Sequence, residues 1–510
     1  MAGTEGAYCT PAFSPDGQWL TFFDTRVSEL KKIAIQGGPP ITLVKAGGLL
    51  GSAWASQDSI IYSDADLSGL SMIPSRGGTP ALITHLDAAK GETDHRWPAV
   101  LPGGRAFIFV AGNGKGPDEA QIVAQSLDTG QQRVLVQGGT FPQYLQAGYL
   151  AYVRDGKLMV VPFDARRLQV TGQTIPVSED VQESGFGASQ FSVSSQGSLA
   201  YVPPSRAHRK LAWVTRNGTE ELLPTPAQNF GVVRLSPDGR RIAMELGDQI
   251  WLYDLLRDTL TRFTVEGDSS GAPVWSPDGK RLAFLSETEG RLDVFWQPAD
   301  GSAGRERLTG PASPRLSWAI TTGSGILPSS WSPDGQFLAY SDEKTLTHAD
   351  IWVLRLTDRK PLPFLQTPFS ERAPAFSPDG RWLAYSSDES GRYEVYVRSY
   401  PDAGAKYVVS TEGGTEPLWN PKGRELFYRN GNKVMAVDIQ TKLAFSAAKP
   451  RLLFEGQYAS IGAPLGRNRS FDVSPDGQRF LMTKPSSEST QINLVLNWIQ
   501  ELQDRAAPGQ

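Results

Sequence analysis

Short apolar segments recur along this chain, and tight polar turns separate them. The clearest copy starts with the apolar residues 373–376, turns at residues 377–380 and continues through residues 381–386. In that second segment, side chains on both faces of an extended strand are apolar, which is typical of a sheet packed between two other sheets. After a polar loop, residues 393–397 and 407–410 form two more apolar segments. The pattern predicts one sheet of four antiparallel strands from this stretch.

The turn between the first two segments is itself repeated. Its sequence, Ser-Pro-Asp-Gly, suits a tight turn because Pro presets the backbone, Asp can bond back to the backbone and Gly accepts a positive φ. Together with degenerate copies it forms eleven repeats, spaced on average by about 46 residues, which is the signature of a β-propeller blade. The intact copies begin at Ser14, Ser236, Ser276, Ser332, Ser377 and Ser474, and the degenerate ones at residues 56, 101, 145, 194 and 420.

Eleven repeats exceed the roughly four to eight blades of a single propeller. We therefore expect an all-β chain with two propellers, at residues 1–230 and 231–510, because the weaker copies lie before this division and the stronger cluster begins after it. No earlier blade or closing strand precedes the first repeat, which predicts an incomplete first propeller. The chain is expected to end with three strands, near residues 471–473, 480–483 and 492–498, and a short helical tail.

Composition supports a globular, turn-rich protein. Hydrophobic residues make up 39% and charged residues 20% of the chain, with 52 Gly and 37 Pro. The formal net charge of −4 lacks the basic excess of a nucleic-acid-binding protein. Cys9 is the only cysteine, which excludes an intrachain disulfide and a cysteine metal cluster. No signal peptide is predicted from the first residues, and no apolar run approaches the roughly 18 residues of a membrane-spanning helix.

Because of the repeated Ser-Pro-Asp-Gly turn and the strand pattern around it, the repeats resemble the TolB-like, WD40-like propeller repeat of bacteria. The resemblance extends over essentially the whole chain. Several stretches are also similar to a narrower group, the propeller half of large membrane-bound bacterial serine/threonine protein kinases, abundant in acidobacteria. In that group a cytoplasmic kinase domain and a membrane helix precede the propeller. The resemblance therefore implies an extracytoplasmic sensory or scaffold module. The stretches are residues 93–98, 121–127, 364–369, 414–417 and 492–498.

The kinase signature itself is missing from this sequence. It contains no glycine-rich loop with kinase spacing, no His-Arg-Asp catalytic loop and no Asp-Phe-Gly. Kinase activity is therefore not carried over from the resemblance.

Two local motifs are interpreted as loops rather than as sites. Residues 267–271 match the Gly-x-Ser-x-Gly nucleophile elbow around Ser269, but a blade strand is expected after them instead of the helix that the elbow requires. Residues 112–116 are rich in glycine, but they lack the strand-to-helix context of a phosphate-binding loop.

One weak metal site is considered. Residues 64–69 copy the first half of an EF-hand loop, with Asp64, Asp66 and Ser68 as candidate ligands. Position 12 of that loop would be Ser75, where a bidentate Glu is required. A plain polar hairpin is the simpler interpretation, and calcium is the divalent metal that the motif would imply.

Polar residues near the starts of the inner strands are the main site candidates. In a propeller this position opens onto the mouth of the central channel, where groups from several blades could bind an ion or an anionic ligand, or position a water for hydrolysis. The alternative is that these residues cap strand ends and form salt bridges between blades. The candidates are Asp94, His95, Arg96, Gln190, Asp268, Glu371, Arg372, Glu416, Arg467 and Arg469.

Two functions remain open on this basis. In the first, the chain is a binding or sensor module that holds a protein, peptide or small-molecule ligand at the channel face. In the second, it is a channel-centred hydrolase of an ester, lactone or phosphoester, with or without a metal. The absence of a recognisable catalytic motif favours the first.

Overall fold

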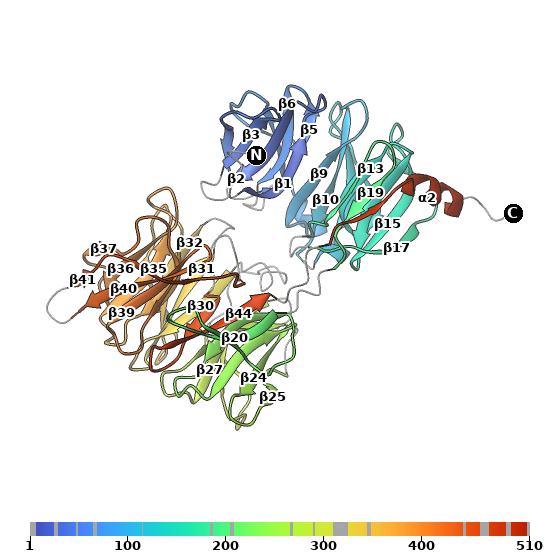
Figure 1. Ribbon diagram of the computed structural model, residues 1–510. Coiled ribbons are helices and arrows are strands. Elements are labelled where there is room, and N and C mark those ends of the chain that lie inside the picture. Colours follow the sequence, from blue (N-terminus) through green and yellow to red (C-terminus); the bar gives the residue numbers. More distant parts are fainter. Residues whose placement is uncertain are drawn as a thin grey trace. The chain divides into compact units, whose positions relative to one another are not determined.

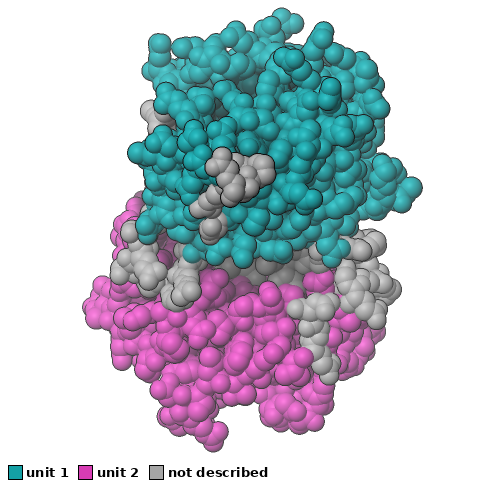
Figure 2. Space-filling model, turned by 90° about the vertical axis from the view of Figure 1, so that its right-hand side faces the viewer, with its two compact units in different colours: residues 1–205, 489–510 teal, residues 206–488 magenta. Residues whose placement is uncertain are grey.

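The computed structural model describes residues 7–24, 29–46, 49–64, 69–114, 116–183, 187–204, 209–265, 269–288, 291–309, 325–343, 348–441, 445–459, 469–485 and 491–506. Two compact units, coloured separately in Figure 2, divide the chain: unit 1 comprises residues 1–205 and 489–510, and unit 2 comprises residues 206–488. Within the described ranges the strands form eleven antiparallel sheets. Each of the eleven predicted turns joins an edge strand of one sheet to the strand next to it, so the predicted propeller repeats are confirmed.

Unit 1 contains five of the sheets. The first two are β1 (Ala7–Phe13), β2 (Trp19–Asp24), β3 (Glu29–Ala34) and β4 (Ile41–Lys45), then β5 (Leu49–Ser56), β6 (Ser59–Asp64), β7 (Leu70–Pro74) and β8 (Ala81–Leu82). The third is β9 (Asp94–Val100), β10 (Ala106–Gly112), β11 (Gln121–Ser126) and β12 (Gln132–Gln137). The fourth is β13 (Thr140–Leu145), β14 (Tyr149–Arg154), β15 (Lys157–Asp164), β16 (Gln169–Val170) and β17 (Ile175–Asp180), and the fifth is β18 (Phe191–Val193), β19 (Leu199–Tyr201) and β45 (Asn493–Val495).

Unit 2 contains the other six sheets. One sheet combines β20 (Arg209–Thr215) and β21 (Glu220–Leu222) with β43 (Phe471–Val473) and β44 (Arg479–Pro485). The next three are β22 (Phe230–Leu235), β23 (Arg241–Leu246), β24 (Gln249–Asp254) and β25 (Thr259–Arg262); β26 (Ser270–Trp275), β27 (Arg281–Thr288), β28 (Arg291–Pro298) and β29 (Glu306–Arg307); and β30 (Gly325–Trp331), β31 (Phe337–Glu343), β32 (Ala349–Arg355) and β33 (Lys360–Leu365). The last two are β34 (Glu371–Phe376), β35 (Trp382–Ser387), β36 (Glu394–Ser399) and β37 (Lys406–Val408), then β38 (Thr415–Trp419), β39 (Glu425–Asn430), β40 (Lys433–Gln440), β41 (Ser446–Ala447) and β42 (Arg451–Glu455).

Helix is scarce in the part of the chain that the structure describes. It consists of α2 (Trp498–Ala506) and two short 3-10 turns, η1 (Ala88–Lys90) and η2 (Pro117–Glu119). This agrees with the expected helical tail. No helix among these residues is long and apolar enough to cross a membrane.

The Ser-Pro-Asp-Gly turns are held by a repeated set of short-range bonds. In the turn between β26 and β27, the Ser276 hydroxyl donates to Asp278 Oδ1 at 2.6 Å and accepts from the Arg281 amide at 2.9 Å. Asp278 Oδ1 also accepts from the Lys280 amide at 3.0 Å. Gly279 completes the turn with a φ of 66°, a conformation that costs a residue with a Cβ more than it costs glycine. The sequence of the turn is therefore sufficient to specify its shape.

Unit 2 is a closed ring. Six separate clusters of buried apolar side chains each join one pair of neighbouring sheets, and together they link all six sheets in a circle. The ring closes because β20 pairs with β44, which lies far along the chain but beside it in Figure 1. Predicted packing on both faces is confirmed in β35, where Leu383 and Tyr385 contact one neighbouring sheet and Ala384 contacts the other.

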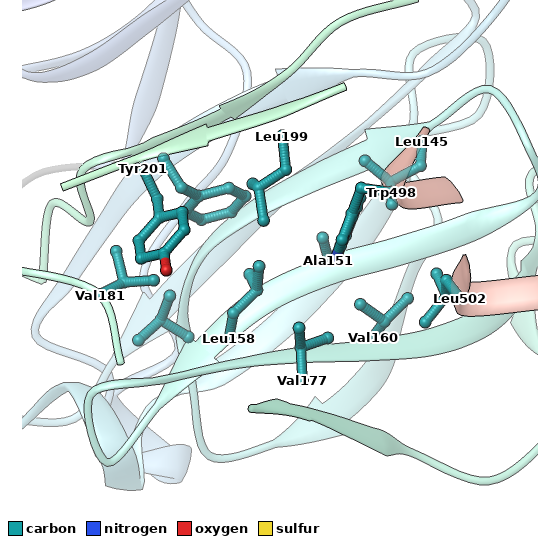
Figure 3. Close-up of a cluster of buried hydrophobic side chains, with 12 residues drawn as sticks. Leu145, Ala151, Leu158, Val160, Val177, Val181, Leu199, Tyr201, Trp498 and Leu502 are labelled. Atoms are coloured by element: carbon teal, nitrogen blue, oxygen red, sulfur yellow. The ribbon is translucent and has the colours of Figure 1, made fainter. Parts of the chain in front are cut away.

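Unit 1 places its five sheets in sequence, with four apolar clusters between them. The cluster of the last two sheets includes Trp498 and Leu502 of α2, which lie at one end of it in Figure 3, opposite Val181 and Tyr201.

Phe13, just before the first turn, is 65% exposed, whereas the corresponding residue of every blade in unit 2 is buried. The expected incompleteness of the first propeller stays a prediction.

The division between the units differs from the expected one between residues 230 and 231. It falls at residues 205/206, and the last residues of the chain return to unit 1. The physical reason is strand pairing over long sequence distances: β20 joins the sheet of β44, and β45 pairs with β19. Repeat strength along the sequence does not report such pairings.

Candidate functional site

A cavity of about 310 Å³ lies where the inner strands of unit 2 reach their turns. All six blades contribute to it, so it occupies the mouth of the central channel. Each blade supplies three equivalent positions: the second residue before the turn, the residue directly before the turn and the turn proline. The first ring is Arg234, Val274, Ser330, Ala375, Leu418 and Asp472; the second is Leu235, Trp275, Trp331, Phe376, Trp419 and Val473; the third is Pro237, Pro277, Pro333, Pro378, Pro421 and Pro475.

Among the described residues that line this cavity, the charged ones lie on one side. Arg234 and Asp472 are the charged members of the first ring, on adjacent blades, and Arg469 lines the cavity beside them. Arg234 Nη1 donates to the carbonyl oxygens of Val233 at 2.8 Å and Arg469 at 2.7 Å. Burial, together with the charge of Arg469, lowers the pKa of Arg234 to about 9. The guanidinium is therefore held where its charge is poorly solvated.

Both oxygens of the Asp472 carboxylate accept hydrogen bonds from backbone amides. Its Oδ2 accepts from the Leu235 amide at 2.9 Å, and its Oδ1 accepts from the Val473 amide at 3.0 Å. Arg469 Nη2 lies 3.6 Å from Asp472 Oδ1, beyond a normal hydrogen bond. Arg234 and Asp472 were missed by sequence reasoning, although a signal exists: both stand two residues before a turn, where other intact repeats of unit 2 carry Val, Ser or Ala.

Unit 1 has a cavity of its own, of about 350 Å³. The inner strands β1, β5, β9 and β13 line it, with Trp54, Trp97 and Phe141 among its aromatic residues. Trp97 and Phe141 meet edge to face, with ring centroids 5.4 Å apart. Among the described residues that line this cavity, none carries a charge.

The sequence-predicted residues of unit 1 are mostly buried in local contacts. Asp94 and Arg96 form an ion pair on β9 and are 2% and 5% exposed. The ring of His95 lies between Thr84, with Nδ1 2.8 Å from its Oγ1, and Glu92, with Nε2 3.1 Å from its Oε2. Burial lowers the pKa of His95. Gln190 is exposed in a separate segment before β18.

In unit 2, three of the sequence-predicted residues are likewise buried. Arg372 donates from Nε to Ser370 Oγ at 2.8 Å, and Glu416 Oε2 accepts from the amide of Ser470 at 2.7 Å. Glu371 accepts a hydrogen bond from Thr367, while its other oxygen, Oε2, is buried without one. Burial, reinforced by neighbouring carboxylates, raises the pKa of Glu371 to about 7.

The predicted site residues are divided between the two units. Of those that are described, Arg469 is the one that lines a cavity. Asp268 and Arg467 lie outside the described residues. For most of the rest, the contacts correspond to the alternative interpretation of strand-end and inter-strand bonds.

The candidate metal and nucleophile positions are described only in part. Asp64 ends β6, whereas Asp66 and Ser68 lie outside the described residues, so the calcium site stays a prediction. Ser269 directly precedes β26, which confirms that a strand and not a helix follows the elbow-like sequence. In the described part of the chain, no group of three or more His, Cys, Asp or Glu side chains is placed to hold a metal ion. The hydrolase alternative rests on the sequence alone and stays a prediction.

A family model matches part of this chain, and several solved structures are similar to it at low sequence identity. A family model described as the TolB beta propeller domain matches residues 315–460. Among solved structures, a putative TolB from Agrobacterium tumefaciens is 16% identical, with a TM-score of 0.45, and the match covers 55% of this chain and 99% of that one. TolB from Acinetobacter baumannii is 15% identical, with a TM-score of 0.32 and coverage of 69% and 80%. Tricorn protease is 13% identical, with a TM-score of 0.32 and coverage of 97% and 54%.

Proposed function

We propose that this TolB-like β-propeller protein is a binding module that holds a partner protein or another ligand at the channel mouth of unit 2. The observation that carries the proposal is the convergence of all six blades of unit 2 on one cavity of about 310 Å³. Ligands usually bind in concave sites with mostly apolar walls and a few polar groups. The match to a TolB propeller model over residues 315–460 agrees with a role in protein–protein interaction.

The experiment blocks the mouth of the cavity without disturbing its walls. Pro421 is an exposed member of the proline ring, and Pro421→Trp would place a large side chain across the opening. Pro361 is exposed on the outer strand β33, so Pro361→Trp is the matched control. Partners cross-linked to the wild-type protein and identified by mass spectrometry should be lost with Pro421→Trp and kept with Pro361→Trp.

Equal recovery of the same partners by all three proteins would contradict the proposed location. The thermal midpoints of the three proteins are compared first, so that loss of binding is not mistaken for loss of folding.

A further inference from the structure

The cavity of unit 2 has charged residues on one side, and the rest of its wall consists of apolar residues and four serines. Among the described residues that line it, Arg234 and Arg469 are positive and Asp472 is negative. Arg234 is 3% exposed, and Arg469 is half-buried, with 15% of its side chain exposed. A charge near a low-dielectric wall acts more strongly than the same charge in open water.

Carboxylates oppose part of this positive charge, because Asp472, Glu245 and Glu416 raise the pKa of Arg234 against the effect of burial. Of these three, Asp472 lines the cavity. Both oxygens of Asp472 accept backbone amides, and its contact with Arg469 is 3.6 Å long. Burial is the main reason for the lowered pKa of Arg234, and repulsion from the guanidinium of Arg469 adds to it. An anion placed beside them would relieve that repulsion.

Three tryptophans present apolar surface to the cavity. The indole N–H of Trp275 donates to the carbonyl of Arg234 at 3.1 Å, that of Trp331 to Val274 at 3.2 Å and that of Trp419 to Ala375 at 3.0 Å. Because these donors already bind neighbouring blades, the indoles present only apolar surface to the cavity. The ring of turn prolines adds more apolar surface and no amide donor.

We propose that the channel mouth of unit 2 takes an anionic group joined to an apolar body, with the anion beside Arg469 and Arg234 and the body against the indoles and prolines. This inference rests on the proposed function and names the chemistry of its ligand. A carboxylate on an apolar body occurs both in small aromatic acids and at the C-terminus of a polypeptide. The uncharged cavity of unit 1 is not expected to show the same preference.

The experiment compares acids with their neutral amides on the full chain. Phenylacetate and phenylacetamide represent the small ligand, and N-acetylphenylalanine and its amide represent a chain terminus. Binding is measured by isothermal titration or by line broadening of the probe signals. We expect at least one acid to bind at least tenfold more tightly than its amide.

Three variants test whether the named residues cause the preference. Arg469→Gln should weaken acid binding at least tenfold. Asp472→Asn should strengthen it, because it removes the negative charge that the described part of the wall contains. Arg240 is an exposed cation on the turn between β22 and β23, so Arg240→Gln is the control for long-range attraction and should change binding less than twofold.

The outcomes separate the inference from the function on which it rests. Preference for N-acetylphenylalanine alone would support a polypeptide terminus, and preference for both acids would support a small acid as well. Three results would overturn the inference. They are equal binding of acids and amides, no binding of either acid at concentrations on the order of 10 mM, and acid binding that Arg469→Gln leaves unchanged. If partner capture nevertheless depends on Pro421, the proposed function survives and only the ligand chemistry is wrong.

Discussion

At the scale of single residues, burial decides what a titratable side chain can do. His95 is a good example, because its side chain is fully buried between Thr84 and Glu92. A carboxylate only accepts hydrogen bonds, so Nε2 carries the proton and Nδ1 accepts from the Thr84 hydroxyl. The imidazole thus connects the segment before β9 to the end of the preceding sheet.

Glu371 provides a prediction about pH. The ordinary pKa of 4.5 is raised to about 7 in the folded protein, first by burial. Between these values the folded state keeps a proton that the unfolded state has released, so this residue's stabilising contribution is present below pH 4.5 and lost as the pH rises to about 7. Glu371→Gln should therefore be more stable than wild type at pH 8, by about 3 kcal/mol at most, and should lose this advantage at pH 4.5.

Urea unfolding across this pH range is the measurement. Glu455→Gln, at an exposed end of β42, serves as the control. A gain in stability that does not depend on pH would mean that the raised pKa is not the cause.

Gly335 tests the geometry of the turns. Its φ is 71°, and nothing lies within 4 Å of an added Cβ, so the backbone conformation alone disfavours a substitution. Gly335→Ala should lower the free energy of unfolding by about 1–2 kcal/mol. Gly304 also has open space around it but no positive φ, and Gly304→Ala should be close to neutral. Similar changes for both variants in urea unfolding would show that φ is not the determinant.

At the scale of elements, one hydrogen bond is repeated between blades. A tryptophan at the end of an inner strand donates its indole N–H to a carbonyl of the preceding inner strand, as Trp54 does to Ala12 in unit 1 at 3.1 Å and Trp275 does to Arg234 in unit 2 at 3.1 Å. Side-chain packing and other hydrogen bonds, such as that from the Leu235 amide to Asp472, also join neighbouring sheets. The repeated indole bond adds a contact at the same position of several blades and so helps to fix one blade along its neighbour.

Trp275→Phe removes that bond, so the Arg234 carbonyl loses the indole N–H as a donor. We expect a loss of about 1–3 kcal/mol in the free energy of unfolding of unit 2. Trp352 is the matched control, because it is half-buried and its indole nitrogen makes no hydrogen bond. Trp352→Phe should cost less than Trp275→Phe by chemical denaturation, and the reverse order would contradict the role assigned to the indole bond.

An element can be predicted from the sequence when the interactions that form it join residues close together in the chain. The Ser276 turn is made within six residues, and every such turn was predictable. Bulges in several inner strands were not predicted: β34 shifts register between Arg372 and Ala375, and Ala373, which precedes Pro374, has a φ of 51°. The pairing of β45 with β19 depends on contacts between residues far apart in the chain. Predicting the site required comparing aligned repeat positions, where Arg234 and Asp472 stand out, rather than searching for known motifs.

At the scale of the whole molecule, unit 2 is inserted into unit 1. The chain leaves unit 1 after β19, builds all of unit 2 and returns to pair β45 with β19. The first and last strands of unit 2 belong to one sheet, which closes its ring without help from unit 1.

A chain of residues 209–485 should therefore fold on its own, with a single cooperative unfolding transition. Residues 7–204 alone should be markedly less stable, because the core of the last two sheets of unit 1 includes Trp498 and Leu502. Adding residues 489–510 through a flexible linker should restore that stability. Circular dichroism and calorimetry can compare the three chains, and a fully stable 7–204 chain would show that α2 is dispensable.

The return of β45 to β19 also imposes an order on biosynthesis. When β19 leaves the ribosome, the strand that completes its sheet is still about 290 residues from being made, which at roughly 5–20 residues per second is a delay of roughly 15–60 s. During that time the apolar cluster that Trp498 and Leu502 will cover is unfinished and open to chaperones or to neighbouring nascent chains. Unit 2 can close before this happens, so the part of the protein that begins synthesis first is the part that finishes folding last.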